Sequence, residues 1–447
     1  MIHALYDLAT RLAQPLLRRK LRRRALAEPG YGQAVPERFG RYGAAPARPV
    51  PQAGAPLVWI HAVSLGETRA AAIVLPHLRA QWPGMRLLLT HGTATGRAEG
   101  ARLLAPGDVQ LWQPWDTRAA TRRFVQAYRP DIGVLMETEV WPNLVRACTD
   151  AGMPLVLANA RLSDKSLRGA RRTAGLLPAA YRALTAVYAQ TEPDAARFRA
   201  LGAPVAGVLG NLKFDARPAE PLLALGRRWR DAAAGRPVLM LASSREGEEL
   251  EFFKQIRAAA RAESAQAATN NAVHRPQWLV VPRHPQRFDA VAALAAQQGL
   301  SVSRRSQWGA GAPPGADVWL GDSLGEMAAY YALADVALLG GSFEPLGGQN
   351  LIEAAACGCP VVMGPHTFNF SQAAEQALAA GAAWRVADLQ EGVRAAQALA
   401  ADTAARAAMA RAGQAFASRH QGAAQRTADA LRGLWSPGPR HGGATTG

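Results

Sequence analysis

Cysteine is scarce in this 447-residue chain, which contains only three. Three cysteines cannot form a disulfide framework, and their scarcity favours a reducing compartment. Cys357 and Cys359 are separated by a single glycine, which is not the spacing of a zinc site, so we expect both to be small buried residues. The Asp-x-Asp pair that would suggest a catalytic metal is also absent from the sequence. We therefore predict neither a disulfide scaffold nor a metal site.

Two glycine-rich nucleotide motifs are missing as well. The chain contains neither the G-x-x-x-x-G-K-[ST] of P-loop proteins nor the G-x-G-x-x-G of dinucleotide-binding enzymes, so both classes of protein have little support. Apolar residues make up 49% of the chain and charged residues 19%, which is typical of a globular protein. A chain of this length is too long for one ordinary core, so we expect two domains.

The first 24 residues contain no apolar run long enough to span a membrane, which takes roughly 20 residues. Asp7 and Arg11 interrupt the pattern, and Pro15 predicts a kink. No small-residue cleavage site follows, so we do not expect a signal peptide. Spacings of three or four residues nevertheless predict one apolar helical face, made by Ile2, Leu5, Leu8, Leu12 and Leu16.

Acidic residues are too few to balance the basic ones, because 34 Asp and Glu against 51 Lys and Arg give a net charge of +17. Such a field attracts nucleic acid, anionic lipid or phosphorylated substrates. An Arg-rich composition explains part of this excess, but not residues 18–24, where all but one side chain is basic. An amphipathic helix followed by a basic run favours binding to an anionic membrane surface, at about 1 kcal/mol per basic side chain. The alternatives are a helix packed on the body of the protein and a nucleic-acid arm, and no interleaved aromatic residues support the arm.

Strand-like runs alternate with helix-like runs along the rest of the chain, which predicts parallel sheets with right-handed crossovers. The runs of the first half are Leu57–Ala62, Arg86–Thr90, Ile132–Met136, Leu155–Ala158 and Ala186–Ala189. Those of the second half are Val238–Ala242, Trp278–Val281, Asp317–Leu320, Val336–Leu339 and Pro360–Met363. We expect a membrane-associating segment at 1–43, α/β domains at 44–217 and 218–435, and a disordered tail at 436–447.

Charged side chains follow several of these strands, and the carboxyl ends of strands are where open α/β sheets bind ligands. Glu67, in "WIHAVSLGET", stands in the first turn of a predicted helix. It either complements the helix dipole, which is common, or acts as a general base, and we expect the helix end to keep it ionised. Glu137 and Glu139, in "LMETEVWPN", need partners, for which Arg161 and Lys213 are candidates, and a structural ion-pair network is the alternative role. Lys213 lies at the domain boundary, where a cation can meet a phosphate or a carboxylate.

The second half contains the most specific stretch, "LLGGSFEPLGGQNLIEAAACGCPVVMGPHTFNF" (338–370). Its two glycine pairs let the backbone approach a phosphate, and a helix starting at Asn350 favours the phosphate charge. Glu353, in the first turn of that helix, suits ribose hydroxyls. Arg283, in "LVVPRHPQRF", can bind a phosphate through two N–H groups. A further anion or nucleotide seat is predicted at the turn in "WLGDSLGEMAAYY" (319–331), near Leu324, Gly325 and Glu326.

Taken together, these motifs resemble those of the 3-deoxy-D-manno-octulosonate (Kdo) transferases of Gram-negative bacteria. The resemblance runs over nearly the whole chain and is carried by "HAVSLGE", "METEVWPNL", "NARLS", "GNLKFD", "EGEE", "VPRHPQRF" and "GGQNLIEAA". It implies an α/β fold of the glycosyltransferase B type, with two facing Rossmann-like domains, parallel sheets and an interdomain cleft. It also implies inverting transfer of Kdo from CMP-Kdo to a lipid A precursor (lipid IVA) in lipopolysaccharide biosynthesis, without a metal or cofactor. The location that it implies is the cytoplasmic face of the inner membrane, with the protein peripheral or weakly anchored.

The resemblance also implies roles for single residues. Glu67 matches the general base, and Glu137 and Lys213 match positions that stabilise the transition state. The positions that match the CMP seat are Pro282, Arg283, Leu324, Gly325, Glu326, Asn350, Leu351, Ile352 and Glu353. Gln349 and Arg245 depart from the pattern, because many relatives carry histidine at both positions. Gln349 can form hydrogen bonds but cannot become cationic near pH 7, so its role stays open.

Other functions are compatible with the sequence alone. The nearest is another two-domain nucleotide-sugar enzyme, either a UDP-sugar glycosyltransferase or an epimerase. From a different class, a basic nucleic-acid-binding protein would explain the charge. We expect no nucleic-acid partner, because the acids and glycines gather after strands and no platform for stacking bases is evident.

Overall fold

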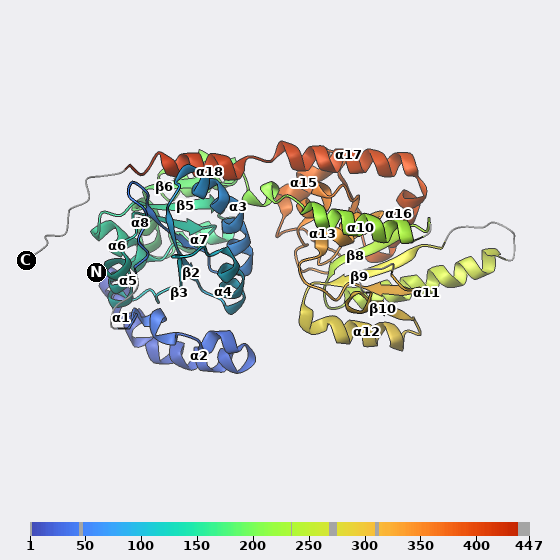
Figure 1. Cartoon of the computed structure of the whole chain (residues 1–447), viewed down its shortest axis with the longest axis horizontal. Helices are drawn as coiled ribbons and strands as arrows, with labels where there is room; N and C mark the ends of the chain where they lie inside the picture. Colours follow the sequence, from blue (N-terminus) through green and yellow to red (C-terminus); the bar gives the residue numbers. More distant parts are fainter. Residues whose placement is uncertain (1, 44–47, 234, 268–274, 309–312, 437–447) are drawn as a thin grey trace, which may run out of the picture. The chain divides into compact units, whose positions relative to one another are not determined.

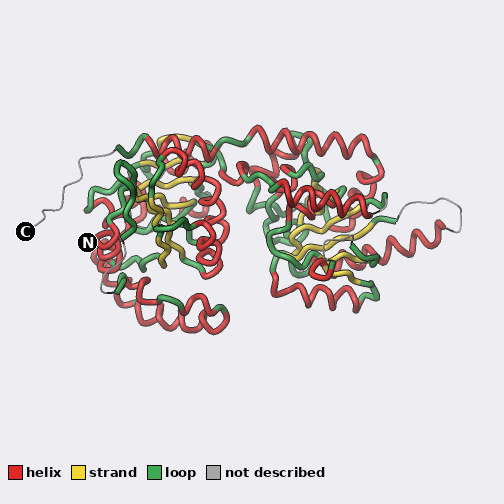
Figure 2. The backbone as a smooth tube through the Cα atoms, in the orientation of Figure 1, coloured by secondary structure: helices red, strands yellow, loops and turns green. Residues whose placement is uncertain are grey.

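The computed structural model describes residues 2–43, 48–233, 235–267, 275–308 and 313–436. These residues form two compact units. The first contains the chain up to Asp215 together with the residues from Gln421 onward, and the second contains Ala216–His420. Each unit is built on a seven-stranded parallel sheet with helices packed against it (Figures 1 and 2).

The sheet of the first unit has the strand order β3-β2-β1-β4-β5-β6-β7. Its strands are β1 (Leu57–His61), β2 (Arg86–His91), β3 (Val109–Trp112), β4 (Ile132–Met136), β5 (Leu155–Ala160), β6 (Ala186–Ala189) and β7 (Val205–Val208). The helices are α1 (Ile2–Leu12), α2 (Gln14–Ala27), α3 (Leu65–Gln81), α4 (Ala94–Gly100), α5 (Arg118–Tyr128), α6 (Pro142–Asp150), α7 (Asp164–Arg171), α8 (Leu176–Arg182), α9 (Glu192–Arg199) and α18 (Ala423–Arg432). Short 3₁₀ helices add η1 (Pro29–Gly32), η2 (Val35–Phe39), η3 (Ala101–Leu103) and η4 (Leu212–Asp215).

Both faces of this sheet are covered, which explains why its central strands β1, β4 and β5 are buried at every position. Leu57 and Trp59 of β1 pack on one face with Phe124 of α5. Val58 and Ile60, which alternate with them, pack on the other face with residues of α3 and α18. The carboxyl ends of β1, β4 and β5 therefore lie at one edge of a rigid core.

The second unit has the strand order β10-β11-β9-β8-β12-β13-β14. Its strands are β8 (Val238–Ser244), β9 (Gln277–Pro282), β10 (Val302–Arg304), β11 (Val318–Leu320), β12 (Val336–Leu339), β13 (Val361–Met363) and β14 (Ala383–Arg385). The helices are α10 (Glu220–Ala232), α11 (Glu248–Ala267), α12 (Phe288–Gln297), α13 (Met327–Leu333), α14 (Leu351–Ala356), α15 (Ser371–Ala379), α16 (Leu389–Ala401) and α17 (Thr403–Arg419), with 3₁₀ helices η5 (Pro285–Arg287) and η6 (Arg305–Gln307). The neighbouring strands β11, β9, β8 and β12 bring the segments of the predicted nucleotide seat to one edge.

Every strand predicted from the sequence is present, with ends within one or two residues of the predicted ones. The domain boundary predicted at residue 217 lies close to the division after Asp215. The predicted tail lies outside the described residues beyond Ser436.

The end of the second domain differs from the prediction, because α18 belongs to the first unit and not to a domain at 218–435. Ala424, Ala428 and Leu431 of α18 are buried in the first unit's core, and Figure 1 shows the helix beside that unit's strands. The Asp215 carboxylate accepts hydrogen bonds from the N–H groups of Gly422 and Ala424, each at 2.5 Å. No pattern in the sequence indicated that the chain goes back to the first unit, because α18 is a short Ala-rich helix that follows another Ala-rich helix.

Candidate active site

Glu67 lies in the first turn of α3, directly after β1. The Val63 N–H donates to its Oε2 at 2.8 Å, and the Ser64 hydroxyl donates to its Oε1 at 3.0 Å. In return, Ser64 caps the helix by accepting from the Glu67 N–H at 3.4 Å. This reciprocal pair is a variant of the capping box, in which the carboxylate accepts from the Val63 N–H and not from that of Ser64, and it fixes the position of the carboxylate. Glu67 is nevertheless 8% exposed, so it is nearly removed from solvent.

The charge state of Glu67 differs from the sequence expectation. Its pKa is raised from 4.5 to about 7, chiefly by burial and next by the neighbouring Glu139 carboxylate, with a smaller effect from Glu137. The hydrogen bonds from Val63 and Ser64 lower the pKa but do not offset the burial. This raised pKa contradicts the expectation that the helix end keeps Glu67 ionised near pH 7. A pKa near the operating pH suits a group that accepts a proton during a reaction.

Glu137 follows β4 and is paired with both cations that the sequence offered. Its Oε2 lies 2.8 Å from Arg161 Nε, and its Oε1 lies 3.3 Å from Lys213 Nζ. The residue is 3% exposed and has a φ of 57°, a left-handed conformation that non-glycine residues rarely adopt. Its N–H donates to the carbonyl of Ala158, and its own carbonyl accepts from the Arg161 N–H, so the turn is held from both sides. The predicted pairing is confirmed, and it places Lys213 beside the strand-end carboxylates.

Glu139 lies in the same turn but is held differently. The Trp141 indole N–H donates to its Oε2 at 2.9 Å. Burial raises the pKa of Glu139, and the Trp141 hydrogen bond opposes that rise. Glu67, Glu137 and Glu139 therefore form a group of carboxylates at the carboxyl ends of β1 and β4, with Lys213 and Arg161 as the cations beside them.

The glycine-rich turn of the second unit is fixed by a buried acid that sequence reasoning did not assign to the site. Glu248, 1% exposed at the start of α11, accepts from the N–H groups of Arg245 at 2.9 Å, Gly341 at 2.8 Å and Phe343 at 3.3 Å. Gly341 has a φ of 69°, and a Cβ at Gly340 would lie 2.5 Å from the Ser243 carbonyl oxygen. Glycine is thus required at both positions. The signal for Glu248 was the acid run "EGEE" directly after β8.

Arg283 follows Pro282, the last residue of β9, and points toward the glycine-rich turn. Its N–H donates to the Ser244 carbonyl at 3.0 Å, and its Nε–H donates to Gln349 Oε1 at 3.2 Å. Arg283 is exposed. The sequence predicted a phosphate contact for Arg283 and left the role of Gln349 open, and the structure brings their side chains into contact.

The other predicted nucleotide contacts lie at two short helices. Asn350 caps α14 by accepting from the Ile352 N–H at 3.1 Å, and Glu353 lies half-buried in the first turn. The side chains of Leu351 and Ile352 are buried, so only their backbone can meet a ligand.

Before α13, Leu324 is 73% exposed and Gly325 has a φ of 83°. Glu326 accepts from Arg305 at 2.9 Å and also from the Ser323 hydroxyl. The turn thus exposes the Leu324 side chain and backbone groups to a ligand, while the Glu326 carboxylate is bound to Arg305 and Ser323.

The N-terminal helices expose the predicted apolar face. Leu5, Leu8, Leu12 and Leu16 are each more than half exposed. The Tyr6 hydroxyl donates to Asp116 Oδ2 at 2.8 Å, which ties α1 to the first unit. Within the described residues, no helix is both long enough and apolar enough to cross a membrane.

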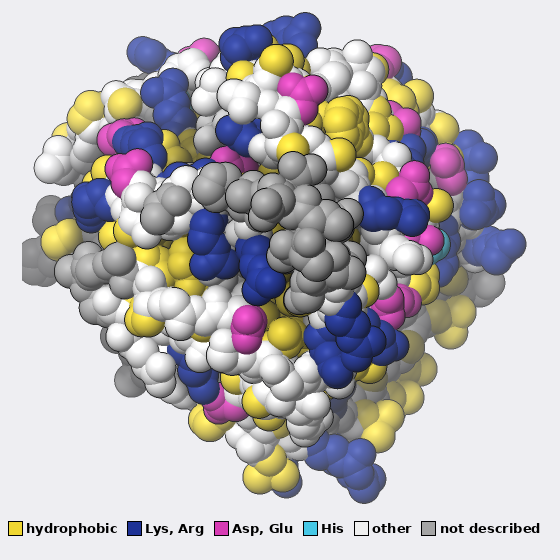
Figure 3. Space-filling view, turned by 90° about the vertical axis from the view of Figure 1, so that its right-hand side faces the viewer, with side chains coloured by type: hydrophobic (Ala, Val, Ile, Leu, Met, Phe, Trp, Pro, Cys, Tyr) yellow, Lys and Arg dark blue, Asp and Glu magenta, His cyan; other side chains and the backbone are white. Residues whose placement is uncertain are grey.

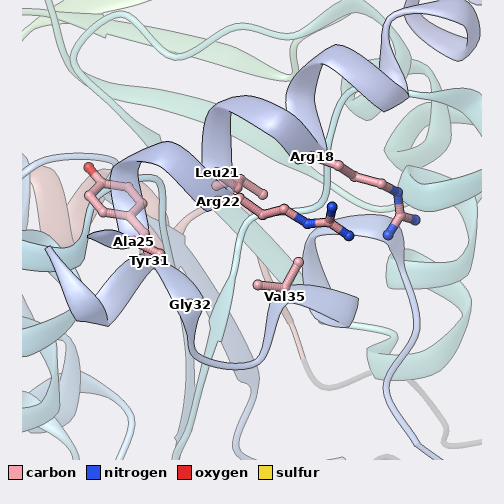
Figure 4. A pocket seen from close by; sticks show the side chains of 7 residues that line it. All are labelled: Arg18, Leu21, Arg22, Ala25, Tyr31, Gly32 and Val35. Carbon is pink, nitrogen blue, oxygen red and sulfur yellow. The ribbon is translucent and has the colours of Figure 1, made fainter. Parts of the chain in front are cut away.

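Helix α2 packs on the first unit through one side and leaves basic residues on the other. Leu21 is buried with Tyr31 and Phe39, and the Arg18 guanidinium lies 3.8 Å from the centre of the Phe39 ring. Figure 4 shows Leu21 and Arg22 on the side of α2 that faces Val35. By the helical period, the exposed side chains Arg19, Lys20 and Arg23 lie on the opposite side.

Basic side chains are not confined to this segment. On the face shown in Figure 3, dark-blue Lys and Arg side chains lie in separate groups, with hydrophobic and acidic atoms between them.

Comparisons with known proteins connect both units to one family. The model of the 3-deoxy-D-manno-octulosonic-acid transferase (kdotransferase) family matches residues 33–216, and a glycosyl transferase-like model matches residues 291–432. A 3-deoxy-D-manno-octulosonic acid transferase of Bordetella pertussis is 49% identical over 438 residues, covering 96% of this chain and 99% of the relative. The corresponding enzyme of Haemophilus influenzae is 31% identical over 428 residues, covering 94% and 96%.

Solved structures share the fold at low identity. Anabaena Alr3699/HepE in complex with UDP matches with a TM-score of 0.56 and 17% identity, over 85% of this chain and 100% of that protein. The UDP-GlcNAc 2-epimerase of Neisseria meningitidis matches with a TM-score of 0.54 and 13% identity, over 84% and 99%. These matches concern the fold alone, and they confirm the predicted two-domain α/β architecture of the glycosyltransferase B type. The chain therefore belongs to the 3-deoxy-D-manno-octulosonic-acid transferase family and is a glycosyltransferase that transfers Kdo in lipopolysaccharide biosynthesis.

Proposed function

We propose that Glu67 is the general base that activates the acceptor alcohol. The acceptor is a sugar hydroxyl of a lipid A precursor (lipid IVA), and the donor is CMP-Kdo. Glu67 takes the hydroxyl proton while the oxygen bonds to the anomeric carbon of Kdo, and the bond from that carbon to the CMP phosphate oxygen breaks on the opposite face. The observation that carries this proposal is a carboxylate fixed by Val63 and Ser64 with a pKa of about 7.

Lys213 and Glu137 act on the Kdo side of the reaction. Kdo carries its own carboxylate, and the Lys213 ammonium is the complementary charge. The ion pair with Glu137 at 3.3 Å fixes the direction of the Lys213 side chain. Arg161 shares the Glu137 carboxylate, which lies beside the positive charge that develops on the sugar ring.

CMP is held by the second unit. Arg283 and the glycine-rich turn meet the phosphate, which leaves with negative charge, and the α14 amide groups add N–H donors. Glu353 accepts hydrogen bonds from ribose hydroxyls. The remaining contacts are backbone and apolar contacts from Pro282, Leu324, Gly325, Glu326, Asn350, Leu351 and Ile352. No metal or cofactor takes part in any of these steps.

The lipid acceptor explains the exposed N-terminal surface. We assign the protein to the cytoplasmic face of the inner membrane, held by the leucines of α1 and by the basic side of α2. Burying a leucine in the acyl boundary contributes about 1.5–3 kcal/mol.

The test is a reconstituted reaction. Purified protein is mixed with CMP-Kdo and lipid IVA in anionic vesicles, and the lipid is analysed by mass spectrometry for added Kdo residues. We expect Kdo addition by the wild type, and a rate about 100- to 10,000-fold lower for Glu67→Gln, as for loss of a general base. Near-normal turnover of a folded Glu67→Gln variant would refute the assignment of the base.

A further inference from the structure

Arg245 and Gln349, the two positions that depart from the family pattern, lie together above Gly341. A Cβ built on Gly341 would lie 3.1 Å from Gln349 Nε2 and 3.5 Å from Arg245 Cγ. The two side chains, which are 104 positions apart in the sequence, therefore cover the same glycine. The Arg283 Nε–H donates to Gln349 Oε1 at 3.2 Å, so Arg283 joins the same group.

The backbone beneath this group is fixed. The buried Glu248 carboxylate accepts from the N–H groups of Arg245 and Gly341 at once, through the same Oε2. It thus ties the turn after β8 to the turn after β12. The Arg283 N–H in turn donates to the Ser244 carbonyl, which joins the turn after β9 to that after β8. Three strand ends therefore present Arg245, Arg283 and Gln349 from a rigid base.

The charge in this region is strongly positive. The pKa of His284 is lowered, first by burial and then by Arg245, Arg283 and Arg287, which places these three guanidinium groups around it. Arg287 is neutralised by Glu249, to which it donates at 2.7 and 3.0 Å, and it also lies 3.6 Å from Glu246. The acids near the group are Glu246, Glu248, Glu249 and Glu344, whose Oε1 would lie 3.8 Å from a Cβ built on Gly247.

Arg245 differs from Arg287 in this respect. Among the ion pairs of the described residues, none involves the Arg245 guanidinium, whereas its backbone N–H is bound by Glu248. An arginine held over a glycine-rich turn by its backbone, with its charge not offset by an acid, is suited to bind an anion.

We propose that Arg245 is a second cationic contact to the phosphate of the donor nucleotide, and that Gln349 is a positioning residue that orients Arg283 toward the same phosphate. This inference rests on the proposed binding of CMP-Kdo by the second unit. Neither arginine nor glutamine titrates near neutral pH, so the positive charge of this site does not depend on pH in that range. A histidine at position 245 would lose its charge as the pH rises through about 6.5.

The test compares binding of CMP with binding of cytidine, which lacks the phosphate, by isothermal titration calorimetry. We expect Arg245→Ala to weaken CMP binding about 10- to 100-fold and to leave cytidine binding within about twofold, because a charge-assisted hydrogen bond is lost only for CMP. Arg245→Lys should recover part of the CMP affinity. Gln349→Ala should weaken CMP binding about three- to tenfold through loss of the Arg283 orientation, with cytidine again unchanged. The matched control is Arg257→Ala on the exposed side of α11, which should change neither affinity.

A pH series provides a readout that a merely structural role would not alter. For Arg245→His, the ratio of the CMP dissociation constant to that of the wild type should rise about tenfold between pH 5.5 and pH 7.5, because the imidazole loses its proton. Using the ratio removes the ionisation of the CMP phosphate itself. A flat ratio would contradict the phosphate contact.

The outcomes separate this inference from the proposed function. If the wild type shows no binding of CMP, the assignment of the donor fails and the inference fails with it. If the wild type binds CMP more tightly than cytidine and Arg245→Ala retains that preference, the inference alone is wrong. Equal loss of CMP and cytidine in a variant that melts at the wild-type temperature would also overturn it.

Discussion

At the scale of single residues, Glu67 combines a structural role with the chemical role that we propose for it. The sequence suggested that these were alternatives, either a helix-capping acid or a base. In the structure the capping box is the device that holds a buried carboxylate, and burial gives that carboxylate a pKa of about 7. The same carboxylate can therefore stabilise the helix and accept a proton.

The pH dependence of the reaction follows from this pKa. With Glu67 as the base, kcat/KM should rise as the pH increases from about 6 to 8, and it should level off once the carboxylate is fully ionised. Initial rates over pH 5.5–9, with the vesicle-bound acceptor well below its KM, measure this profile. Glu192→Gln, which changes an exposed acid on α9, should keep both the profile and the rate. A rate independent of pH between 6 and 8 would exclude this base.

The stability of the folded protein should fall with rising pH, whereas kcat/KM rises. The pKa of Glu67 is higher in the folded state than the usual 4.5, so the folded state binds more protons between about pH 4.5 and 7 and loses stability as the pH rises through that window. Glu67→Gln removes this cost, which is at most about 3 kcal/mol by linkage for a shift of this size. The unfolding midpoint of the variant relative to the wild type should therefore be higher at pH 8 than at pH 5. An equal difference at both values would show that Glu67 is not destabilised by burial.

Much of the site could be predicted from single residues, but not its energetics. The rule that ligands bind beyond the carboxyl ends of strands drew attention to Glu67, Glu137 and Lys213 as candidates. The cost of an unpaired carboxylate there suggested Arg161 and Lys213 as partners for the two acids of the β4 turn. The pKa of Glu67 could not be predicted, because it depends on the depth of burial and on the distance to Glu139. Glu248 was missed for a related reason, since its three N–H partners come from separate turns that only the fold brings together.

At the scale of the elements, the strands that the sequence predicted and those that it missed differ in one physical property. The four missed strands, β3, β7, β10 and β14, are the outermost strands of the two sheets. Central strands are covered on both faces and carry continuous apolar runs. Edge strands such as β7 and β14 are partly exposed, so their residues are mixed in polarity and resemble loops.

The N-terminal helices allow a test of membrane association without loss of the fold. Deletion of residues 1–24 would remove Leu21, which is buried against Tyr31 and Phe39. Point variants of the exposed face are cleaner, because Leu5, Leu8 and Leu12 contribute little to the core. The triple change of these leucines to serine should weaken binding to anionic vesicles by more than 100-fold, given about 1.5–3 kcal/mol per leucine buried.

Vesicle cosedimentation measures this effect. Val50→Ser removes an exposed apolar side chain outside the helices and should leave vesicle binding unchanged. High salt should also weaken vesicle binding by the wild type, because salt screens the attraction between the basic side of α2 and the anionic lipid. Full vesicle binding by the triple variant would place the membrane contact elsewhere on the protein.

At the scale of the whole molecule, the chain passes from the first unit to the second after Asp215 and returns after His420. Asp215, the last residue before the chain enters the second unit, also holds the start of the returning helix, because its carboxylate binds the first N–H groups of α18. Further along, the Trp82 and Trp435 rings meet edge to face at 5.9 Å. One residue of the outgoing connection therefore anchors the returning helix, and this coupling could not be predicted from local sequence patterns.

Replacing Asp215 tests that coupling. Asp215→Ala removes a carboxylate that caps α18 and complements its dipole, so we expect the first unit to lose about 1–2 kcal/mol of stability. Amide hydrogen exchange should become faster in α18 and in the part of α3 that it covers, because the Asp215 carboxylate binds the N–H groups at the start of α18. Exchange in α11 and α16 of the second unit should not change, and Asp231→Ala, at an exposed acid of α10, should leave α18 protected. If α18 stays protected from exchange in Asp215→Ala, its buried Ala and Leu side chains are sufficient to hold it on the first unit. The Asp215 carboxylate then has no part in anchoring the helix.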